Sequence, residues 1–276
     1  MLGLYLLRAE RDLPPMGMAH DEIAQRIYAE HRGGVRFHSL ARDFDIPDVD
    51  TAYRIQQRYT ELMIGTEGDP VGYKIGLTSS RMQRMCNIDS PVSGAILANR
   101  AHRSGGELDL RRYGRLGVEF EIALRLGHDL NPADAPFNEA EMGEAVDGVC
   151  AAIELVDDRH ADYSSLDAIS LIADNSWNAG AVLGNFVSGW DDLSALCGIV
   201  RLNGIEIDRG YGRDVLGHPL VALTWLANHL ARTAKGLRAG DVVLTGSIAP
   251  TRFPHAGENF DFDLIGVGTV AVRVSG

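Results

Sequence analysis

Residues 117–124 alternate between apolar and acidic side chains, and this pattern constrains the fold more than any other stretch of the chain. Successive side chains of a β-strand point to opposite faces, so a strand here gathers the apolar residues on one face and Glu119 and Glu121 on the other. Two neighbouring carboxylates repel each other, and burying them without a partner is costly. The acidic face is therefore either exposed to water or close to a positive charge.

Residues 151–157 add a third carboxylate in a more apolar setting. Glu154 has alanine, isoleucine, leucine and valine around it, a pattern typical of a strand that is buried on both faces. A glutamate is rarely fully buried unless it is paired. An exposed face is the simpler interpretation of Glu119 and Glu121 alone. Three carboxylates that converge on one point would instead suit a hard divalent cation, Mg²⁺ or else Mn²⁺.

Charge and cysteine content narrow the class of protein. The net charge of −12 argues against nucleic acid or an anionic membrane as the main partner. It does not exclude a small anionic substrate, because a bound metal can reverse the local potential. The cysteines, at positions 86, 150 and 197, are too widely spaced for a disulfide framework or a zinc site. We therefore expect a cytoplasmic protein without membrane spans.

The chain divides into three predicted parts. Residues 1–17 form a leader that we expect to be disordered. Residues 18–69 contain two helical patterns, which end near Gly33 and Gly65 and predict an N-terminal helical cap. From residue 70 onward strand and turn signals dominate, so we predict a mixed α/β main domain over 70–276.

A lysine in the first predicted strand of the main domain is a candidate functional residue. Lys74 shares a face of the strand at 71–77 with Gly72 and Gly76, whose small size leaves room for a ligand beside the ammonium group. A surface lysine that extends into water fits the same pattern equally well.

Two polar turns complete the candidates. Asp174 and Asn175 open a run of donors, acceptors and a glycine that is typical of an irregular binding loop. The strand from residue 241 ends in a small polar turn that includes Gly246 and Ser247, and backbone N–H groups of such a turn can bind a carboxylate.

Six motifs occur in a fixed order along residues 20–276. They are Gly72-Tyr73-Lys74-Ile75-Gly76-Leu77-Thr78-Ser79, Val118-Glu119-Phe120-Glu121-Ile122-Ala123, Ile153-Glu154-Leu155-Val156-Asp157, Ile172-Ala173-Asp174-Asn175, Leu216-Gly217-His218-Pro219 and Leu244-Thr245-Gly246-Ser247. Together they resemble the 2-keto-4-pentenoate hydratase family. That family includes the 4-oxalocrotonate decarboxylases and belongs to the fumarylacetoacetate hydrolase superfamily.

The resemblance implies a fold, an activity and a set of site residues. The fold would be a mixed β-roll or barrel decorated with helices, in a homo-oligomeric lyase of aromatic meta-cleavage catabolism. The metal ligands would be Glu119, Glu121 and Glu154. We add Lys74, Asp174 and Ser247 as predicted catalytic residues, and Thr78, Asn175 and Gly246 as predicted substrate-binding residues.

One motif departs from the family pattern and leaves the reaction open. The hydratases carry Pro-Asp-Tyr-Gly or Pro-Asp-Phe-Gly where this chain has Pro91-Val92-Ser93-Gly94, and the missing Asp is an acid/base candidate. The decarboxylases tend to have an aliphatic residue there but usually keep the Tyr. We expect a Mg²⁺-dependent hydratase of a 2-hydroxy-2,4-dienoate, with a 4-oxalocrotonate-type decarboxylase as the alternative.

Two further hypotheses remain. Hydrolysis of an acylpyruvate would need a water-activating residue, for which His160 is the only nearby suggestion. A non-catalytic partner subunit of a hydratase–decarboxylase complex is a hypothesis from another class, but a scaffold gains nothing from clustered carboxylates.

Overall fold

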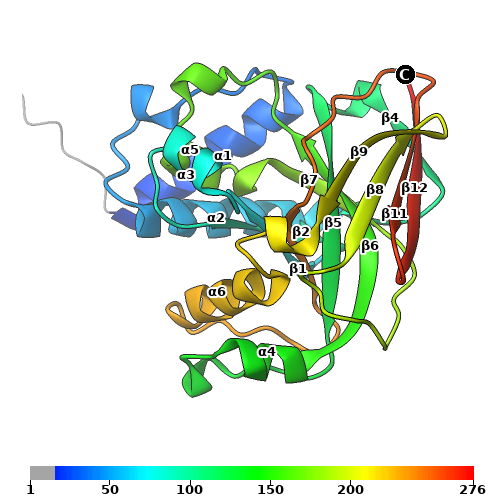
Figure 1. Cartoon of the computed structure of the whole chain (residues 1–276). Helices are drawn as coiled ribbons and strands as arrows, with labels where there is room; N and C mark the ends of the chain where they lie inside the picture. Colours follow the sequence, from blue (N-terminus) through cyan, green and yellow to red (C-terminus); the bar gives the residue numbers. More distant parts are fainter. Residues whose placement is uncertain (1–15) are drawn as a thin grey trace, which may run out of the picture.

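Two β-sheets pack face to face, with helices beside and below them, in the computed structural model, which describes residues 16–276 (Figure 1). The larger sheet contains β2 (Val92–Leu97), β1 (Pro70–Gly76), β10 (Val242–Ser247), β5 (Leu116–Leu126), β6 (Val146–Asp157), β7 (Asn178–Leu183) and β3 (Ala101–Arg103), in that order. The smaller contains β4 (Gly106–Asp109), β12 (Gly268–Ser275), β11 (Asn259–Leu264), β8 (Cys197–Leu202) and β9 (Ile205–Tyr211). The helices are α1 (Met16–Arg32), α2 (Val49–Glu67), α3 (Ser80–Met85), α4 (Glu139–Ala145), α5 (Ala168–Ala173) and α6 (Pro219–Ala231).

Strand β5 joins the two sheets through its apolar face, as its alternating sequence predicts. The Phe120 side chain is fully buried, and its ring centroid lies 6.0 Å from that of Phe260 and 5.6 Å from that of Phe262, both on β11 of the smaller sheet. Burying a phenylalanine side chain stabilises a fold by about 1.5–3 kcal/mol. The acidic residues of β5 consequently point to the other face of the larger sheet.

The larger sheet curls around that acidic face. Lys74 on β1 and Glu154 on β6 are three strand spacings apart, roughly 14 Å in a flat sheet. Their charged groups are nevertheless 3.1 Å apart, and β2 also contacts β7. The acidic face is therefore the inner, concave one, and the predicted helix-decorated β-roll is confirmed.

Helices α1 and α2 form the predicted cap and pack on the rest of the chain. Their apolar side chains share one buried cluster with Leu97 of β2 and Ala173 of α5. Helix α2 begins after Asp48, whose side chain accepts a hydrogen bond from the backbone N–H of Thr51 (2.7 Å). The division of the chain at residue 69 remains a prediction.

Two boundaries differ from their predicted positions. Helix α1 begins at Met16, so the last two residues of the predicted leader are helical, and its other residues, 1–15, lie outside the described part of the chain. Helix α2 continues past Gly65, because one glycine costs a helix only about 1 kcal/mol, and ends at Gly68, whose φ of 77° favours glycine. Between residues 16 and 276, no helix has the length and apolarity that a bilayer span requires.

Candidate metal centre and active site

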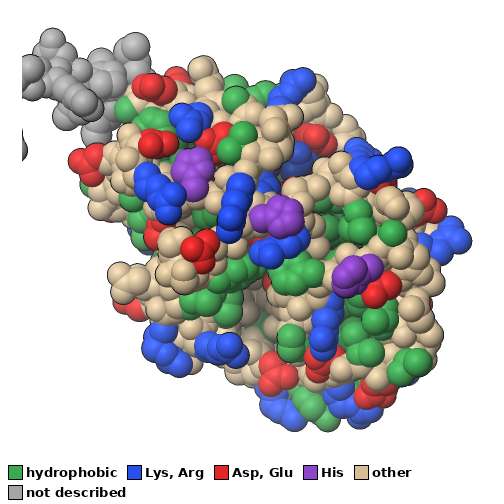
Figure 2. Space-filling model, turned by 90° about the horizontal axis from the view of Figure 1, so that it is seen from above, with side chains coloured by type: hydrophobic (Ala, Val, Ile, Leu, Met, Phe, Trp, Pro, Cys, Tyr) green, Lys and Arg blue, Asp and Glu red, His purple; other side chains and the backbone are tan. Residues whose placement is uncertain are grey.

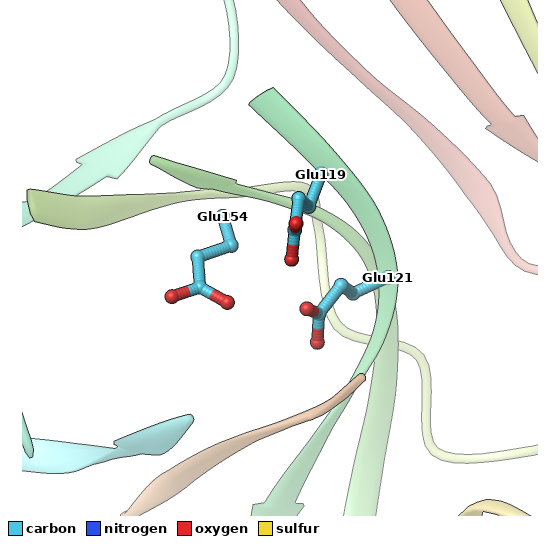
Figure 3. A group of neighbouring side chains, drawn as sticks. All are labelled: Glu119, Glu121 and Glu154. Atoms are coloured by element: carbon cyan, nitrogen blue, oxygen red, sulfur yellow. The ribbon is translucent and has the colours of Figure 1, made fainter. Parts of the chain in front are cut away.

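Three glutamates converge on the concave face of the larger sheet (Figure 3). Glu119 and Glu121 alternate along β5, and Glu154 on β6 lies directly opposite Glu119 in the strand register. One carboxylate oxygen from each residue lies within 4.8 Å of the other two. Glu121 and Glu154 are fully buried, and Glu119 is partly exposed. The predicted convergence of the three side chains is confirmed.

The protein holds one oxygen of each carboxylate. Glu121 Oε2 accepts a hydrogen bond from the backbone N–H of Gly246 (2.7 Å). Glu119 Oε1 accepts one from the Thr251 hydroxyl (2.5 Å). Glu154 Oε1 accepts one from Asn178 Nδ2 (3.0 Å) and also lies 3.1 Å from the ammonium group of Lys74. The three side chains are thereby fixed in direction.

The remaining oxygens of the two buried glutamates are unsatisfied. Glu121 Oε1 and Glu154 Oε2 are buried and have no hydrogen-bond partner among residues 16–276. Burial and the neighbouring carboxylates raise the pKa of both side chains above the ordinary value. Buried carboxylate oxygens without partners are rare, and hard divalent cations prefer such ligands. The acidic cluster can therefore hold a metal ion.

Lys74 is the cation nearest to this cluster for which the structure gives a contact. Burial lowers the pKa of its ammonium group, but the carboxylates of the three glutamates outweigh that effect and raise the pKa above its ordinary value. A Cβ atom on Gly76 would lie 3.1 Å from Nζ, so the glycine leaves space there, as predicted. The side chain of Val92 approaches the same space, since its Cγ2 would lie 3.4 Å from that Cβ. An aliphatic group thus flanks the lysine at the position where the hydratases carry Asp.

The predicted loop residues Asp174 and Asn175 are both engaged within the protein. The two carboxylate oxygens of Asp174 pair with Arg159 and His31, and this pairing outweighs burial to lower the pKa of Asp174. The Asn175 side chain accepts a hydrogen bond from the N–H of Ala95 (2.7 Å) and donates one to its carbonyl (2.9 Å). Both side chains therefore tie the turn to neighbouring elements.

The second predicted turn lies beside Glu121. Gly246 has a φ of 117°, and a Cβ on it would lie 2.5 Å from Thr78 Oγ1, so Thr78 packs directly on the glycine. The Ser247 hydroxyl donates to the carbonyl of Ala249 (2.7 Å). The turn binds a carboxylate through a backbone N–H group, as expected, but that carboxylate belongs to Glu121 of the protein itself.

Sequence reasoning missed two residues that contact the acidic cluster. Asn178 lies in the polar run that begins at Asp174, so the composition of that run was the available signal. Thr251 follows a proline in a loop far from Glu119 in the sequence, and no local pattern marks it.

A basic pocket lies at the end of the molecule where β5 begins and β6 ends. Its volume is about 360 Å³, and it is lined by Gly34, Arg36, Gly114, Arg115, Arg159, His160 and Ala161. Figure 2 looks down on this end and shows basic and histidine side chains together near the middle of the face. Two of these arginines are paired with buried carboxylates, Arg115 with Asp158 and Arg159 with Asp174, so much of the positive charge here is balanced within the protein. A larger cavity, about 1230 Å³, lies between α2 and α6, and none of the three glutamates lines it.

The curled sheet and its acidic centre define an enzyme of the fumarylacetoacetate hydrolase fold with a site that can hold a metal ion. Residues 87–275 match the family described as fumarylacetoacetate (FAA) hydrolase C-terminal. The chain belongs to the 2-keto-4-pentenoate hydratase and 4-oxalocrotonate decarboxylase family of that superfamily, and it is a lyase.

Similar proteins support this assignment over nearly the whole chain. A 2-keto-4-pentenoate hydratase of Paraburkholderia xenovorans (strain LB400) is 33% identical over 252 residues, which cover 91% of this chain and 93% of the relative. A 2-oxo-hept-4-ene-1,7-dioate hydratase of Escherichia coli is 29% identical over 92% of this chain and 97% of its own. The structure of 4-oxalocrotonate decarboxylase from Pseudomonas putida G7, complexed with magnesium and adipate, has a TM-score of 0.88 at 25% identity and covers 96% of this chain and 100% of its own.

Proposed function

We propose that the protein is a Mg²⁺-dependent hydratase that adds water to a 2-hydroxy-2,4-dienoate and forms a 4-hydroxy-2-oxo acid. The observation that carries this proposal is the arrangement of three carboxylates around one point. Two of their buried oxygens have no hydrogen-bond partner among residues 16–276, and Lys74 pairs with Glu154. Several relatives that cover most of the chain are named 2-keto-4-pentenoate hydratases, which supports the choice of reaction.

Glu119, Glu121 and Glu154 would hold the metal ion, the last two through Oε1 and Oε2 respectively, which have no partner in the described part of the chain. When bound, Mg²⁺ supplies a Lewis acid for the C1 carboxylate and the 2-oxygen of the substrate. Oxygen ligands alone favour Mg²⁺ over softer metals, and Mn²⁺ is the alternative.

In this proposal Lys74 holds the substrate and transfers a proton. The three carboxylates keep its ammonium group charged in the metal-free protein, and a bound Mg²⁺ would lower this pKa, so that Lys74 can hold an anionic oxygen of the substrate and relay a proton. In the first step the 2-hydroxyl group loses its proton and C5 gains one, which leaves an α,β-unsaturated 2-oxo acid. In the second step the oxygen of water bonds to C4 and a proton adds at C3. Each step conserves atoms and charge.

The other predicted site residues have supporting roles in this mechanism. Asp174 and Asn175 keep the turn before β7 in position through their contacts with Arg159 and Ala95. Gly246 directs Glu121 through its N–H group, with Thr78 packed against it. Ser247 fixes the end of β10 through its hydrogen bond to the following loop.

Decarboxylation of a 4-oxalocrotonate-type diacid is the second candidate reaction. Val92 favours it, because the aliphatic side chain removes a possible acid/base group from the vicinity of Lys74. A non-catalytic partner subunit is less well supported, because a scaffold gains nothing from three clustered carboxylates.

Supplying each substrate separately tests the proposal. Hydration consumes the dienoate and its ultraviolet absorbance, whereas decarboxylation of 4-oxalocrotonate produces it. We expect Glu121→Gln to abolish Mg²⁺-dependent turnover while circular dichroism shows the fold to be retained. Full activity of this variant would rule out the role of the metal.

The proposal extends to the cellular setting of the enzyme. The family resemblance supports a role in aromatic meta-cleavage catabolism. Three free cysteines support a cytoplasmic location. The family resemblance also supports a homo-oligomer, and light scattering would give the number of subunits. Association with a decarboxylase or hydratase of the pathway can be tested by co-purification.

A further inference from the structure

Asn178, the first residue of β7, contacts the acidic cluster through its side-chain amide. Its side chain is only 5% exposed, and Nδ2 donates to Glu154 Oε1 (3.0 Å) and to the carbonyl of Gly180 (3.4 Å). Both partners are acceptors, so the nitrogen of the amide must face them. The amide oxygen, Oδ1, is buried and has no hydrogen-bond partner in the described part of the chain.

The backbone before Asn178 is held in a rarely adopted conformation. All residues of the short helix η6 (Asn175–Trp177) have left-handed φ angles of 50°, 50° and 58°, which are uncommon for residues other than glycine. Ser176 donates from its hydroxyl to the carbonyl of Ser93 (3.0 Å), which anchors the turn to β2. The fold thus sustains a strained turn and delivers Asn178 to Glu154.

The contact with Asn178 fixes which oxygen of Glu154 remains free. Oε1 has two donors, Asn178 and Lys74, whereas Oε2 has none among the described residues. In Figure 3 one carboxylate oxygen of Glu154 is directed toward Glu119 and Glu121 and the other away from them. Without the amide, Lys74 alone would contact Oε1, and the Glu154 carboxylate would lose this fixed direction.

We propose that Asn178 is a positioning residue of the metal centre. By holding Glu154 Oε1 through Nδ2, it keeps the Glu154 carboxylate directed toward the metal ion. This inference rests on the proposed hydratase function and deepens it.

Calorimetry with Mg²⁺ alone tests the positioning role. Asn178→Leu keeps a side chain of similar volume but removes its hydrogen-bonding groups. Asn178→Ala removes both the volume and the hydrogen-bonding groups. We expect either substitution to weaken Mg²⁺ binding about 10–100-fold, as is usual when a group that orients a metal ligand is lost. The matched control is Asn228→Ala on α6, whose amide bonds to the backbone N–H and carbonyl of Phe137 (2.8 and 3.0 Å). It should leave Mg²⁺ affinity unchanged. Wild-type affinity in Asn178→Leu would show that the residue only fills space, and would overturn the proposal.

If the wild-type protein bound no Mg²⁺, the proposed function would fail instead, so the two failures are distinguishable.

Discussion

Replacing Glu121 with glutamine should make the metal-free enzyme more stable and the enzyme in Mg²⁺ less stable relative to the wild type. The carboxylate oxygens of Glu119, Glu121 and Glu154 lie within 4.8 Å of one another. At an effective dielectric constant near 20, two unit charges at that distance repel by about 3 kcal/mol. Glu121 meets two such neighbours and one attracting ammonium group, that of Lys74. The substitution therefore removes a net repulsion on the order of that between one pair of carboxylates, about 3 kcal/mol.

At low pH, protonation of Glu121 in the wild type reduces the repulsion that the substitution removes. The pKa of Glu121 is raised by burial and by its acidic neighbours, so the folded protein binds more protons than the unfolded chain between the unfolded and the folded pKa. The metal-free wild type should therefore lose stability as the pH rises through that window, from about 4.3 upward, and the glutamine variant should not. We expect the variant to gain about 1–3 kcal/mol at neutral pH.

Urea unfolding in EDTA and in excess Mg²⁺ measures both effects. Mg²⁺ at 1,000 times its dissociation constant should stabilise the wild type by about 4.1 kcal/mol and the variant by nearly nothing, which reverses their order. The control is Glu206→Gln, which removes an exposed ion pair with Arg209 and should change stability by less than about 1 kcal/mol in both solutions. A variant that is less stable than the wild type in EDTA would refute the reasoning.

Three further predictions concern the groups around the acidic centre. Asp174→Asn leaves Arg159 buried without its carboxylate, so unfolding in urea at pH 7 should show a loss of about 3–5 kcal/mol. Because pairing lowers the pKa of Asp174, its contribution is present above the unfolded pKa and is lost as the pH falls through the folded value, so the difference from the wild type should shrink in acid and persist at alkaline pH. Lys74→Met should lower kcat for the dienoate at least about 100-fold, yet tighten Mg²⁺ binding in calorimetry, because it removes a neighbouring positive charge; weaker Mg²⁺ binding would contradict this. Val92→Asp should raise the ratio of hydration to decarboxylation rates by up to about 100-fold in parallel assays, at some cost in stability, and an unchanged ratio would exclude this position as the determinant.

Local patterns predicted those parts of the site that depend on one strand at a time. Alternation along β5 is enough to place Glu119 and Glu121 on one face, and the small neighbours of Lys74 indicate the space around its ammonium group. The approach of Glu154 to the other two glutamates depends also on the register of β6 and on the curl of the sheet. The sequence indicates this approach only indirectly, because a glutamate is rarely buried without a partner.

The remaining contacts depend on tertiary structure that no local pattern encodes. Thr251 reaches Glu119 only because the loop after β10 returns beside β5. Asp174 was predicted as a catalytic residue in the loop before β7, and that role stays a prediction; its pairing with His31 depends on how α1 docks, which no motif indicates. A charged residue in a predicted loop therefore indicates a functional region more reliably than it indicates the role of each side chain.

The two faces of β5 have a consequence for how this enzyme can change over evolution. Residues that pack the two sheets together and residues of the acidic cluster alternate along this strand, so inserting or deleting a single residue within it would exchange the two faces. Carboxylates would then enter the apolar interface between the sheets, and Phe120 would take the place of a carboxylate in the acidic cluster. The strand should therefore tolerate substitutions better than changes in length, and new substrate preferences should arise from neighbours such as Val92.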